Sequence, residues 1–401
     1  MRYDARRGKP YGRHSMSDGT SCNAARLSVR GPYAGHGFAV AAFGGPADPT
    51  RAAESAYVEV AAWLTKHRLT VLHERLFGSR DVAPAALAAR RRTLDRAGLE
   101  SDGPVTFVAG RPAWSGRLAG VVVHAVQVSQ DASVVGLRDA QGRSCGRRWS
   151  CRDLDWVVLQ DLPTEMADNP NASAEEWAQR AIEQADSLLL TEGLSYRNVV
   201  RTWFYLDGIA SWYDRFNAIR HARYEAFGLM PRADGSALRL PASTGIGASA
   251  GRPVSLDVLA VAPRTARAAV TQLSNPAQMD AFAYGSAFSR GALVRTPGLT
   301  LMELSGTASI DERGRTMHPH DFDRQVGAMF DRLERLLEGV GTRPADACAA
   351  TAFVKRPEDV PRFRRMLDAR GLSQLPVVCI VADICREELV FELDAELMWC
   401  M

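Results

Sequence analysis

The feature of this 401-residue sequence that most restricts its fold is an internal duplication. The segment LLLTEGLS, with its glycine at Gly193, matches LLEGVGT, with its glycine at Gly341. After these glycines VVRTWFYL aligns with ACAATAFV, YDRFNAIRHAR with VPRFRRMLDAR, and VSLDVLAV with the end of LVFELDAEL. In this alignment we expect Asp257 to take the place of Glu392. Repeated supersecondary units are expected to bury their apolar faces against one another.

Each copy predicts a strand-rich unit of the α+β class, a mixed sheet with two helices on one face. A weaker copy precedes these two, because strand and helix patterns also alternate from about Pro32 onward. We therefore predict three units that form a pseudo-trimer, at residues 31–138, 139–265 and 266–401. Residues 1–30 are predicted to be a leader that need not be ordered, within which Met16 could be the true start.

Three stretches give more specific predictions of secondary structure. Residues 48–76 are predicted to form one long amphipathic helix, because apolar residues recur there at helical spacing. Residues 139–153 are predicted to be a loop. Residues 376–397 are predicted to be two paired strands joined by a turn.

Composition and charge disfavour several classes of protein. The net charge is only +3 and the basic residues are scattered, which argues against nucleic acid as the main partner. The densest basic runs, residues 90–92 and 147–148, are predicted to be solvated. No apolar run reaches the roughly 18 residues needed to cross a bilayer. The polar residues 1–21 lack the apolar core of a secretory signal, so the predicted location is the cytoplasm.

The cysteines give no sign of a metal site. There are seven of them, without a CxxC pair and without a cluster of histidines beside them. This pattern fits free thiols in a reducing compartment. We therefore predict neither a metal nor an organic cofactor.

The strongest candidate for chemistry lies in the C-terminal stretch PVVCIVADICREELVFELDAEL. Alternation places three carboxylates, at Glu392, Asp394 and Glu396, on one face of its second strand, with Cys385 just before it. We expect Asp394 and Glu396 to be structural. Glu392 is either a salt-bridged residue of the sheet or a positioned acid, and the strand pattern leaves both interpretations open.

The third unit resembles the RidA/YjgF fold, through SGTASID, the helix ending in LLEGVG, the strand ACAATAFV and the closing strand. The second unit is similar through EGLSYRNVVRTWFYLDGI. RidA proteins are homotrimers with clefts between subunits, so the resemblance implies a fused pseudo-trimer, as a monomer or a weak oligomer. YGSAFSRG, LMELSGTASIDERG and a cysteine seven residues before Glu392 further resemble the chorismatase family.

The chain also departs from ordinary RidA proteins, whose arginine in a PART-type motif binds the carboxylate of an imine. The matching positions hold Ser243 in PAST and Val377 in PVVC. The resemblance therefore does not imply imine deamination, because the anchor for that substrate is missing.

The chorismatase resemblance implies chorismate as the substrate, with two carboxylates, a ring hydroxyl and an enolpyruvyl ether. Arginine holds a carboxylate through two hydrogen bonds, and we expect Arg201 and Arg290 to be the two anchors. The alternative for Arg201 is a pair with an acidic residue of a neighbouring unit, because an unpaired buried guanidinium is costly. Arg290 could instead be an ordinary turn residue.

Other residues are expected to complete a cleft between the second and third units. Tyr213 and Tyr284 are expected to donate hydrogen bonds, although tyrosines at such positions also serve as packing residues. Gly306 and Thr307 are expected to let the ligand approach closely, and Gly306 is alternatively a bulge in its strand.

Glu392 is the expected general acid. Cleavage of an enolpyruvyl ether requires a proton on its methylene carbon, which a buried glutamic acid with a raised pKa can supply.

Chorismatases divide into branches by product, and a cysteine at position 385 resembles the branch that forms 3-hydroxybenzoate and pyruvate. Gly291 is expected to contribute to the same difference between branches. The alternatives are the hydrolytic branch, which forms a dihydroxycyclohexadiene carboxylate and pyruvate, and a non-catalytic RidA-like protein that only binds a ligand.

Overall fold

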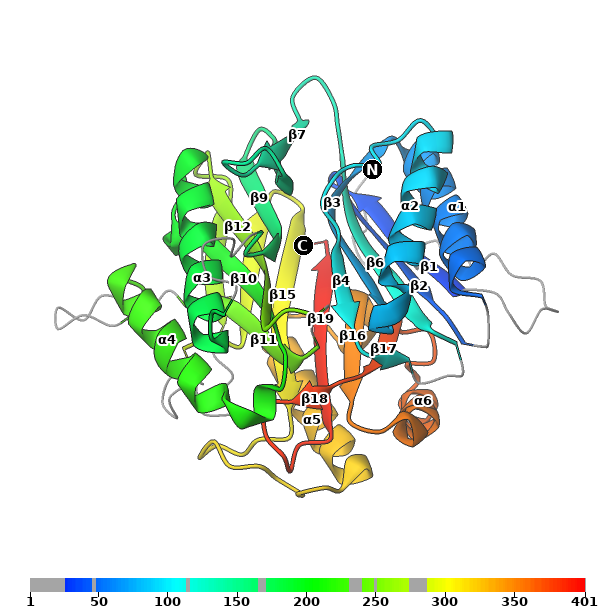
Figure 1. Ribbon diagram of the computed structural model, residues 1–401, viewed down its shortest axis with the longest axis vertical. Coiled ribbons are helices and arrows are strands. Elements are labelled where there is room, and N and C mark those ends of the chain that lie inside the picture. The colour runs from blue at the N-terminus through cyan, green and yellow to red at the C-terminus, as the bar shows by residue number, and fades with distance from the viewer. Residues whose placement is uncertain are drawn as a thin grey trace, which may run out of the picture.

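The computed structural model describes residues 26–44, 48–112, 116–164, 171–230, 240–248, 251–273 and 287–400. These residues form three β-sheets, whose strands converge on a common centre (Figure 1). The first sheet has the order β1 (Arg26–Tyr33), β2 (His36–Ala42), β6 (Leu118–Gln127), β3 (Leu69–Gly78) and β4 (Thr106–Ala109).

The other two sheets are longer and follow the same plan. The second has the order β18 (Asp383–Ile384), β11 (Ala242–Gly247), β10 (Val199–Leu206), β12 (Val254–Pro263), β9 (Leu154–Leu162), β8 (Ser144–Ser150) and β7 (Ser133–Arg138). The third has the order β13 (Ala269–Leu273), β14 (Gly291–Thr296), β15 (Leu299–Ala308), β19 (Phe391–Trp399), β16 (Ala347–Val354), β17 (Val377–Val381) and β5 (Arg111–Pro112). One parallel pair recurs in each sheet: β3 with β4, β10 with β11 and β16 with β17.

Two α-helices cover the outer face of each sheet (Figure 1). They are α1 (Pro49–His67) and α2 (Ala83–Arg96) on the first, α3 (Ala174–Thr191) and α4 (Tyr213–Ala226) on the second, and α5 (Phe322–Glu338) and α6 (Val360–Ala369) on the third. The expected fold class, α+β with two helices on one face of each mixed sheet, is confirmed. None of the helices in the described ranges is both long and apolar enough to span a membrane.

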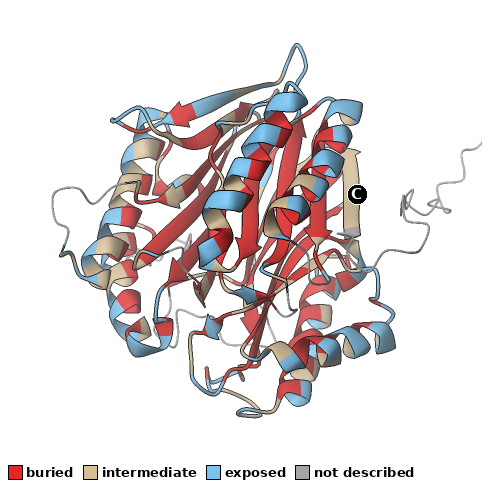
Figure 2. Ribbon diagram, turned by 45° about the vertical axis from the view of Figure 1, so that its right-hand side comes forward, coloured by how far each residue is buried: buried red, intermediate tan, exposed pale blue. Residues whose placement is uncertain are grey.

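Four buried clusters hold these layers together. One lies between each sheet and its helices, whose outer sides are exposed (Figure 2). The fourth lies at the centre, where Phe38, Trp156 and Phe353, one from each sheet, are fully buried. The inner faces of the sheets are therefore as inaccessible to water as their helix-covered faces, so a charge placed there needs a partner.

Two short strands join a sheet that is formed mainly by another part of the chain. β5 pairs with β17 of the third sheet, and β18 pairs with β11 of the second. In addition, β7 precedes residue 139 but belongs to the second sheet, and β1 begins inside the expected leader. The division into three units at the predicted residues stays a prediction.

The long helix predicted for residues 48–76 is wrong in its second half. Helix α1 ends at His67, because Arg68 turns into the left-handed conformation with φ of 53°. The following residues form β3, which is paired with β6 on one side and β4 on the other. In β3, Leu69, Leu72 and Leu76 recur at helical spacing around the polar run of residues 73–75, so periodicity alone did not distinguish this strand from a helix.

The loop predicted for residues 139–153 and the solvated basic runs are also partly wrong. Residues 144–150 form β8, and Arg147 on this strand is fully buried. Its guanidinium donates to Glu100 Oε2 over 2.9 Å and to the Pro104 carbonyl over 3.1 Å. The polar composition of residues 139–153 favoured a loop. The strand is nevertheless stable, because Arg147 finds its hydrogen-bond partners in a distant part of the sequence.

The two strands predicted within residues 376–397 exist, but they are not paired with each other. Strand β16 lies between them, parallel to β17 and antiparallel to β19. The connection therefore crosses over a neighbouring strand instead of closing a hairpin.

Helix α2 allows a direct test of this packing, because its arginine run contains one buried and one exposed ion pair. Arg90 is buried and donates to both Glu74 oxygens over 2.7 and 2.6 Å, whereas Arg92 reaches Glu54 over 3.2 Å near the surface. Replacing Arg90 with Ala should lower the free energy of unfolding by about 3–5 kcal/mol, because Glu74 loses its counter-charge.

The matched control is Arg92→Ala in the same helix, for which we expect about 0–1 kcal/mol. Urea denaturation of both variants measures the difference. Equal losses would contradict the assignment of Arg90 to a buried pair.

Candidate active site

A pocket with about 500 Å³ of free space, part of it open to solvent, lies where the second and third sheets meet. Sites for small molecules span roughly 300–1,000 Å³, so its size suits a small metabolite. The second sheet and α4 contribute Tyr213, Arg220, Ser243 and Gly245. The third part of the chain contributes Phe288, Arg290, Gly306, Ala308, Ile310, Cys385, Arg386 and Glu392.

The Glu392 side chain lies against the backbone of Gly306. On β19 Glu392 is opposite Ala308 of β15, and the pairing of these strands shifts between Leu304 and Thr307. A Cβ atom at Gly306 would lie 1.9 Å from Glu392 Oε1, closer than any two such atoms can approach. The alternative interpretation of Gly306 as a bulge is therefore confirmed, and the absent side chain leaves the space that the Glu392 carboxyl occupies, while close approach of a ligand stays a prediction.

Burial raises the pKa of the Glu392 carboxyl to about 8. The nearby Asp394 carboxylate raises this pKa further, while Arg201 and Arg290 lower it. Within the described part of the chain no hydrogen bond holds the Glu392 carboxyl. The group therefore keeps its proton at neutral pH and can give it to a bound molecule.

Cys385 lines the pocket close to this acid. Burial raises the pKa of its thiol to about 12, and the nearby Glu392 raises it too, while Arg386 and a hydrogen bond from Tyr213 lower it. The sulfur is therefore a neutral thiol at physiological pH, unlike the thiolate that a cysteine nucleophile needs.

Three guanidinium groups surround the same space. Arg220 and Arg290 lie on the ring of Phe288, 5.4 and 5.3 Å from its centroid. Arg386 is fixed by a hydrogen bond of 2.7 Å from its Nη1 to the carbonyl of Gly314. With Glu392 protonated, the charged side chains that line the pocket are all positive.

Arg220 is a pocket residue that the sequence analysis missed. It is buried on α4, where it donates to Asn217 Oδ1 over 2.7 Å and to Ser243 Oγ over 3.4 Å. Phe216 and Tyr224, four residues before and after it, are also buried. An arginine on the apolar face of a predicted helix was the signal that could have identified it.

Arg201 does not line this pocket. It is buried at 1% exposure, and its Nη2 donates to Asp394 Oδ2 over 3.1 Å and to Thr244 Oγ1 over 2.6 Å. Its expected role as a substrate anchor is therefore corrected, since the alternative, a pair with an acidic residue of a neighbouring unit, is what the structure contains. The cause is the depth of β10, which leaves Arg201 facing β19 rather than solvent.

Two further predicted residues lie beside the pocket rather than in its wall. Thr307 is buried and donates its hydroxyl to the Ser305 carbonyl. Gly291 lies in β14, opposite Leu304. Tyr284 is outside the described residues.

The strand pairing also corrects the alignment of the repeated units. On β12, Asp257 is opposite Trp203, and on β19, Asp394 is opposite Thr351. Since Trp203 and Thr351 are equivalent, Asp257 matches Asp394, and Ser255 takes the place of Glu392. The alignment made from the sequence was therefore shifted by two residues along this strand. As a result, Glu392 has no acidic counterpart in the second sheet.

No protein-family model matches the chain. A chorismatase from Streptomyces hygroscopicus is 29% identical over 229 residues, which cover 51% of this chain and 63% of that protein. A 3-hydroxybenzoate synthase from the same organism is 24% identical over 234 residues, 52% of this chain and 66% of that protein. The alignments thus span just under two thirds of either relative.

Among solved structures, a chorismatase crystal structure superposes with a TM-score of 0.57 at 22% sequence identity, covering 82% of this chain and 93% of that chain. This likeness concerns the fold. By sequence the chain is similar to a chorismatase and to a 3-hydroxybenzoate synthase, and its backbone has the fold of a chorismatase.

Proposed function

We propose that the chain is a chorismatase that converts chorismate to 3-hydroxybenzoate and pyruvate. The observation that carries this proposal is a carboxyl group with a pKa of about 8, Glu392, which shares one pocket with three arginine side chains. The similarity to a chorismatase and to a 3-hydroxybenzoate synthase supports the same class of substrate.

The arginines supply the attraction for a ligand with two carboxylates. Arg220 and Arg290 enter from the second sheet's helix and from the third unit, so each can hold one end of a ligand that bridges the cleft. Guanidinium groups bind carboxylates through paired hydrogen bonds, which also fix the orientation of the ligand. Phe288 between them offers an apolar surface for the ring.

The proposed first step is a proton transfer from Glu392 to the methylene carbon of the enolpyruvyl group. The carbon–carbon double bond supplies the electron pair, and an oxocarbenium ion results. Glu392 becomes a carboxylate next to this cation and stabilises it electrostatically. Glu392 must therefore be protonated before this step and ionised after it. A carboxyl group whose pKa is close to the working pH can adopt both forms.

The second step decides the product. Chorismic acid contains the same atoms as 3-hydroxybenzoic and pyruvic acids together, so this branch takes up no water and proceeds with the ring's own hydroxyl. The hydrolytic alternative takes up one water molecule and leaves a non-aromatic diene. We propose that the neutral thiol of Cys385, next to Glu392, occupies space that a water molecule would otherwise fill.

Both sides of the pocket come from one chain among the described residues. This arrangement supports the expectation that a monomer is sufficient for activity. A protein that binds chorismate without releasing pyruvate would instead be the non-catalytic alternative.

Purified protein incubated with chorismate should release pyruvate and form an aromatic product, and Glu392→Gln should reduce the rate by about 10²–10⁴-fold. The amide has nearly the same shape as the protonated acid but no acidic proton. Coupled pyruvate assay and chromatography of the product measure both effects.

Glu303→Gln is the matched control. Glu303 is also buried, and burial together with the nearby Glu396 raises its pKa to about 8, but it does not line the pocket. Full activity of Glu392→Gln, or equal losses in the two variants, would contradict the role of Glu392.

The pH dependence should follow the protonated form of Glu392. Because the acid must carry its proton, kcat/KM should be level below the pKa of about 8 and fall about tenfold per pH unit above it. Steady-state rates between pH 6 and 10 measure this fall of kcat/KM. The pH at which the fall begins should be the same in Glu303→Gln. A rate that rises with pH through this range would show that a base is needed instead.

Replacing Cys385 with Ala should shift the product from 3-hydroxybenzoate toward the diene, because the vacated space admits water. The control is Cys379→Ala, whose thiol lies on β17 and does not line the pocket. Product ratios determined by chromatography test the expectation. An unchanged ratio in Cys385→Ala would remove the basis for assigning the branch to this residue.

A further inference from the structure

Thr244 of β11 lies at the centre of a buried hydrogen-bond network beneath the pocket. Its hydroxyl is 2.6 Å from Arg201 Nη2, 2.9 Å from Asp394 Oδ2 and 3.1 Å from the backbone nitrogen of Gly306. Arginine and the backbone N–H can only donate, so the hydroxyl accepts twice and donates to the carboxylate. One donor and two acceptor sites are the full capacity of a hydroxyl group, which fixes its direction.

The network is attached to the bulge that accommodates the acid. The Gly306 N–H donates to Thr244, and the N–H of the adjacent Ser243 donates to Ser305 Oγ over 3.1 Å. Two hydrogen bonds therefore connect β11 of the second sheet to the bulge of β15 in the third. Because the Glu392 carboxyl occupies the position that a Cβ of Gly306 would take, we expect a movement of the bulge to displace the acid.

A similar network recurs between the first and second sheets, without an acid. Thr106 donates its hydroxyl to Asp257 Oδ1 over 2.6 Å, and His73 Nε2 lies 2.8 Å from Asp257 Oδ2. By strand register Thr106 is equivalent to Thr244, Asp257 to Asp394 and His73 to Arg201.

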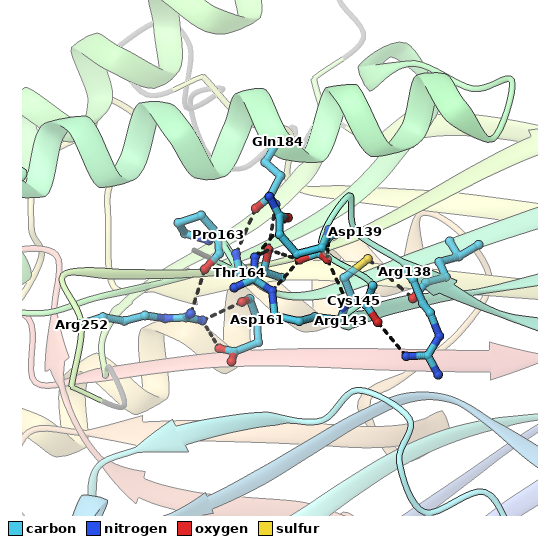
Figure 3. A network of polar contacts seen from close by, with 12 residues as sticks. Arg138, Asp139, Arg143, Cys145, Asp161, Pro163, Thr164, Gln184 and Arg252 are labelled. Carbon is cyan, nitrogen blue, oxygen red and sulfur yellow. Dashed lines mark hydrogen bonds and ion pairs between the residues drawn. The ribbon is translucent and has the colours of Figure 1, made fainter. Parts of the chain in front are cut away.

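In the network between the first and second sheets, Asp161 is equivalent to Gly306. It likewise lies in a bulge, here of strand β9. Asp161 has a φ of 57°, and its N–H donates to Asp257 over 2.8 Å. Its carboxylate pairs with Arg252, which also donates to the Pro163 carbonyl over 2.8 Å (Figure 3). A side chain thus occupies the position that Gly306 leaves open, and Ser255 stands where Glu392 would be. This second network provides an internal control.

We propose that Thr244, held between Arg201 and Asp394, is a positioning residue that fixes the Gly306 bulge and thereby the place of the Glu392 carboxyl. The proposal rests on the proposed function, since it assigns the network to the acid of that reaction. It also gives Arg201 a role behind the pocket, where it compensates the charge of Asp394 rather than that of a substrate. Groups that face Glu392 are Asp394, Arg201, Tyr213, Arg220, Arg290, Cys385 and Arg386.

Thr244→Val tests this proposal, because valine keeps the shape of threonine and removes the hydroxyl. We expect kcat with chorismate to fall by about 10–100-fold, as a misplaced catalytic group loses about 10²-fold. KM should change less than about threefold, because the arginines of the pocket remain in place. Thr244→Ser keeps the hydroxyl and should restore most of kcat.

Thr106→Val is the matched control in the second network. It should lose a comparable amount of thermal stability and keep kcat within about twofold of the unaltered protein. Two outcomes would overturn the proposal: an unchanged kcat in Thr244→Val, or the same loss of kcat in Thr106→Val, which would tie the loss to stability alone.

A titration of the Glu392 carboxyl by ¹³C NMR supplies a readout that does not depend on turnover, with Glu392→Gln identifying the signal. In Thr244→Val the midpoint should fall from about 8 toward the ordinary range, because a loosened bulge admits water, whereas Thr106→Val should leave it in place. If the protein releases no pyruvate from chorismate, the proposed function fails. The titration then still decides the positioning role, and identical midpoints in all proteins would refute it.

Discussion

Strand β19 carries three buried carboxyl groups, and the rest of the site depends on how each is accommodated. A buried carboxylate needs a counter-charge, or else it binds a proton. Asp394 is paired with Arg201, and Glu396 is paired with Arg75. Glu392 has no such ion pair among the described residues, and its pKa is raised to about 8. The same physical cost thus produces two structural ion pairs and one acid that holds its proton at neutral pH.

The sequence predicted the architecture, because repeated helices and strands leave local patterns. Alternation along one strand placed Glu392, Asp394 and Glu396 on one face but did not distinguish between them, and the expected role of Glu392 came from the family resemblance. Arg201 could not be assigned in the same way, since the sequence does not say which strand of another sheet its side chain will meet. Arg220 left a local signal on its helix, but the sequence does not say which residues of the third part of the chain will form the other wall of the pocket. The single error in strand register had the largest effect, since it gave Glu392 an acidic counterpart that the structure does not have.

The contacts between the three sheets show how one of several equivalent places becomes a site. Between the second and third sheets a glycine in the bulge leaves room for Glu392. Between the first and second sheets Asp161 fills that room, and Glu74 neutralises Arg90, which has the same place on α2 as Arg220 has on α4. At the equivalent place between the first and third sheets Gly120 stands where Glu392 would be, and a Cβ there would lie 2.6 Å from the side chain of Val378, so no acidic side chain fits at this position. Small changes at equivalent positions therefore decide whether the contact between two sheets carries an acid in a pocket, a salt bridge or no acidic side chain at all.

The exchange of edge strands sets the order in which the pocket can form during synthesis. The second sheet ends at β11, and the strand that pairs with the outer side of β11 is β18, only a few residues before the acid. Most of the second sheet can thus be complete while this edge waits for β18, which is synthesised well after the other strands of that sheet. An unpaired edge invites association with other chains until it is covered. The C-terminal segment therefore closes the exposed edge and delivers Cys385, Arg386 and Glu392 together, so a chain that lacks it would have neither a protected sheet nor an acid.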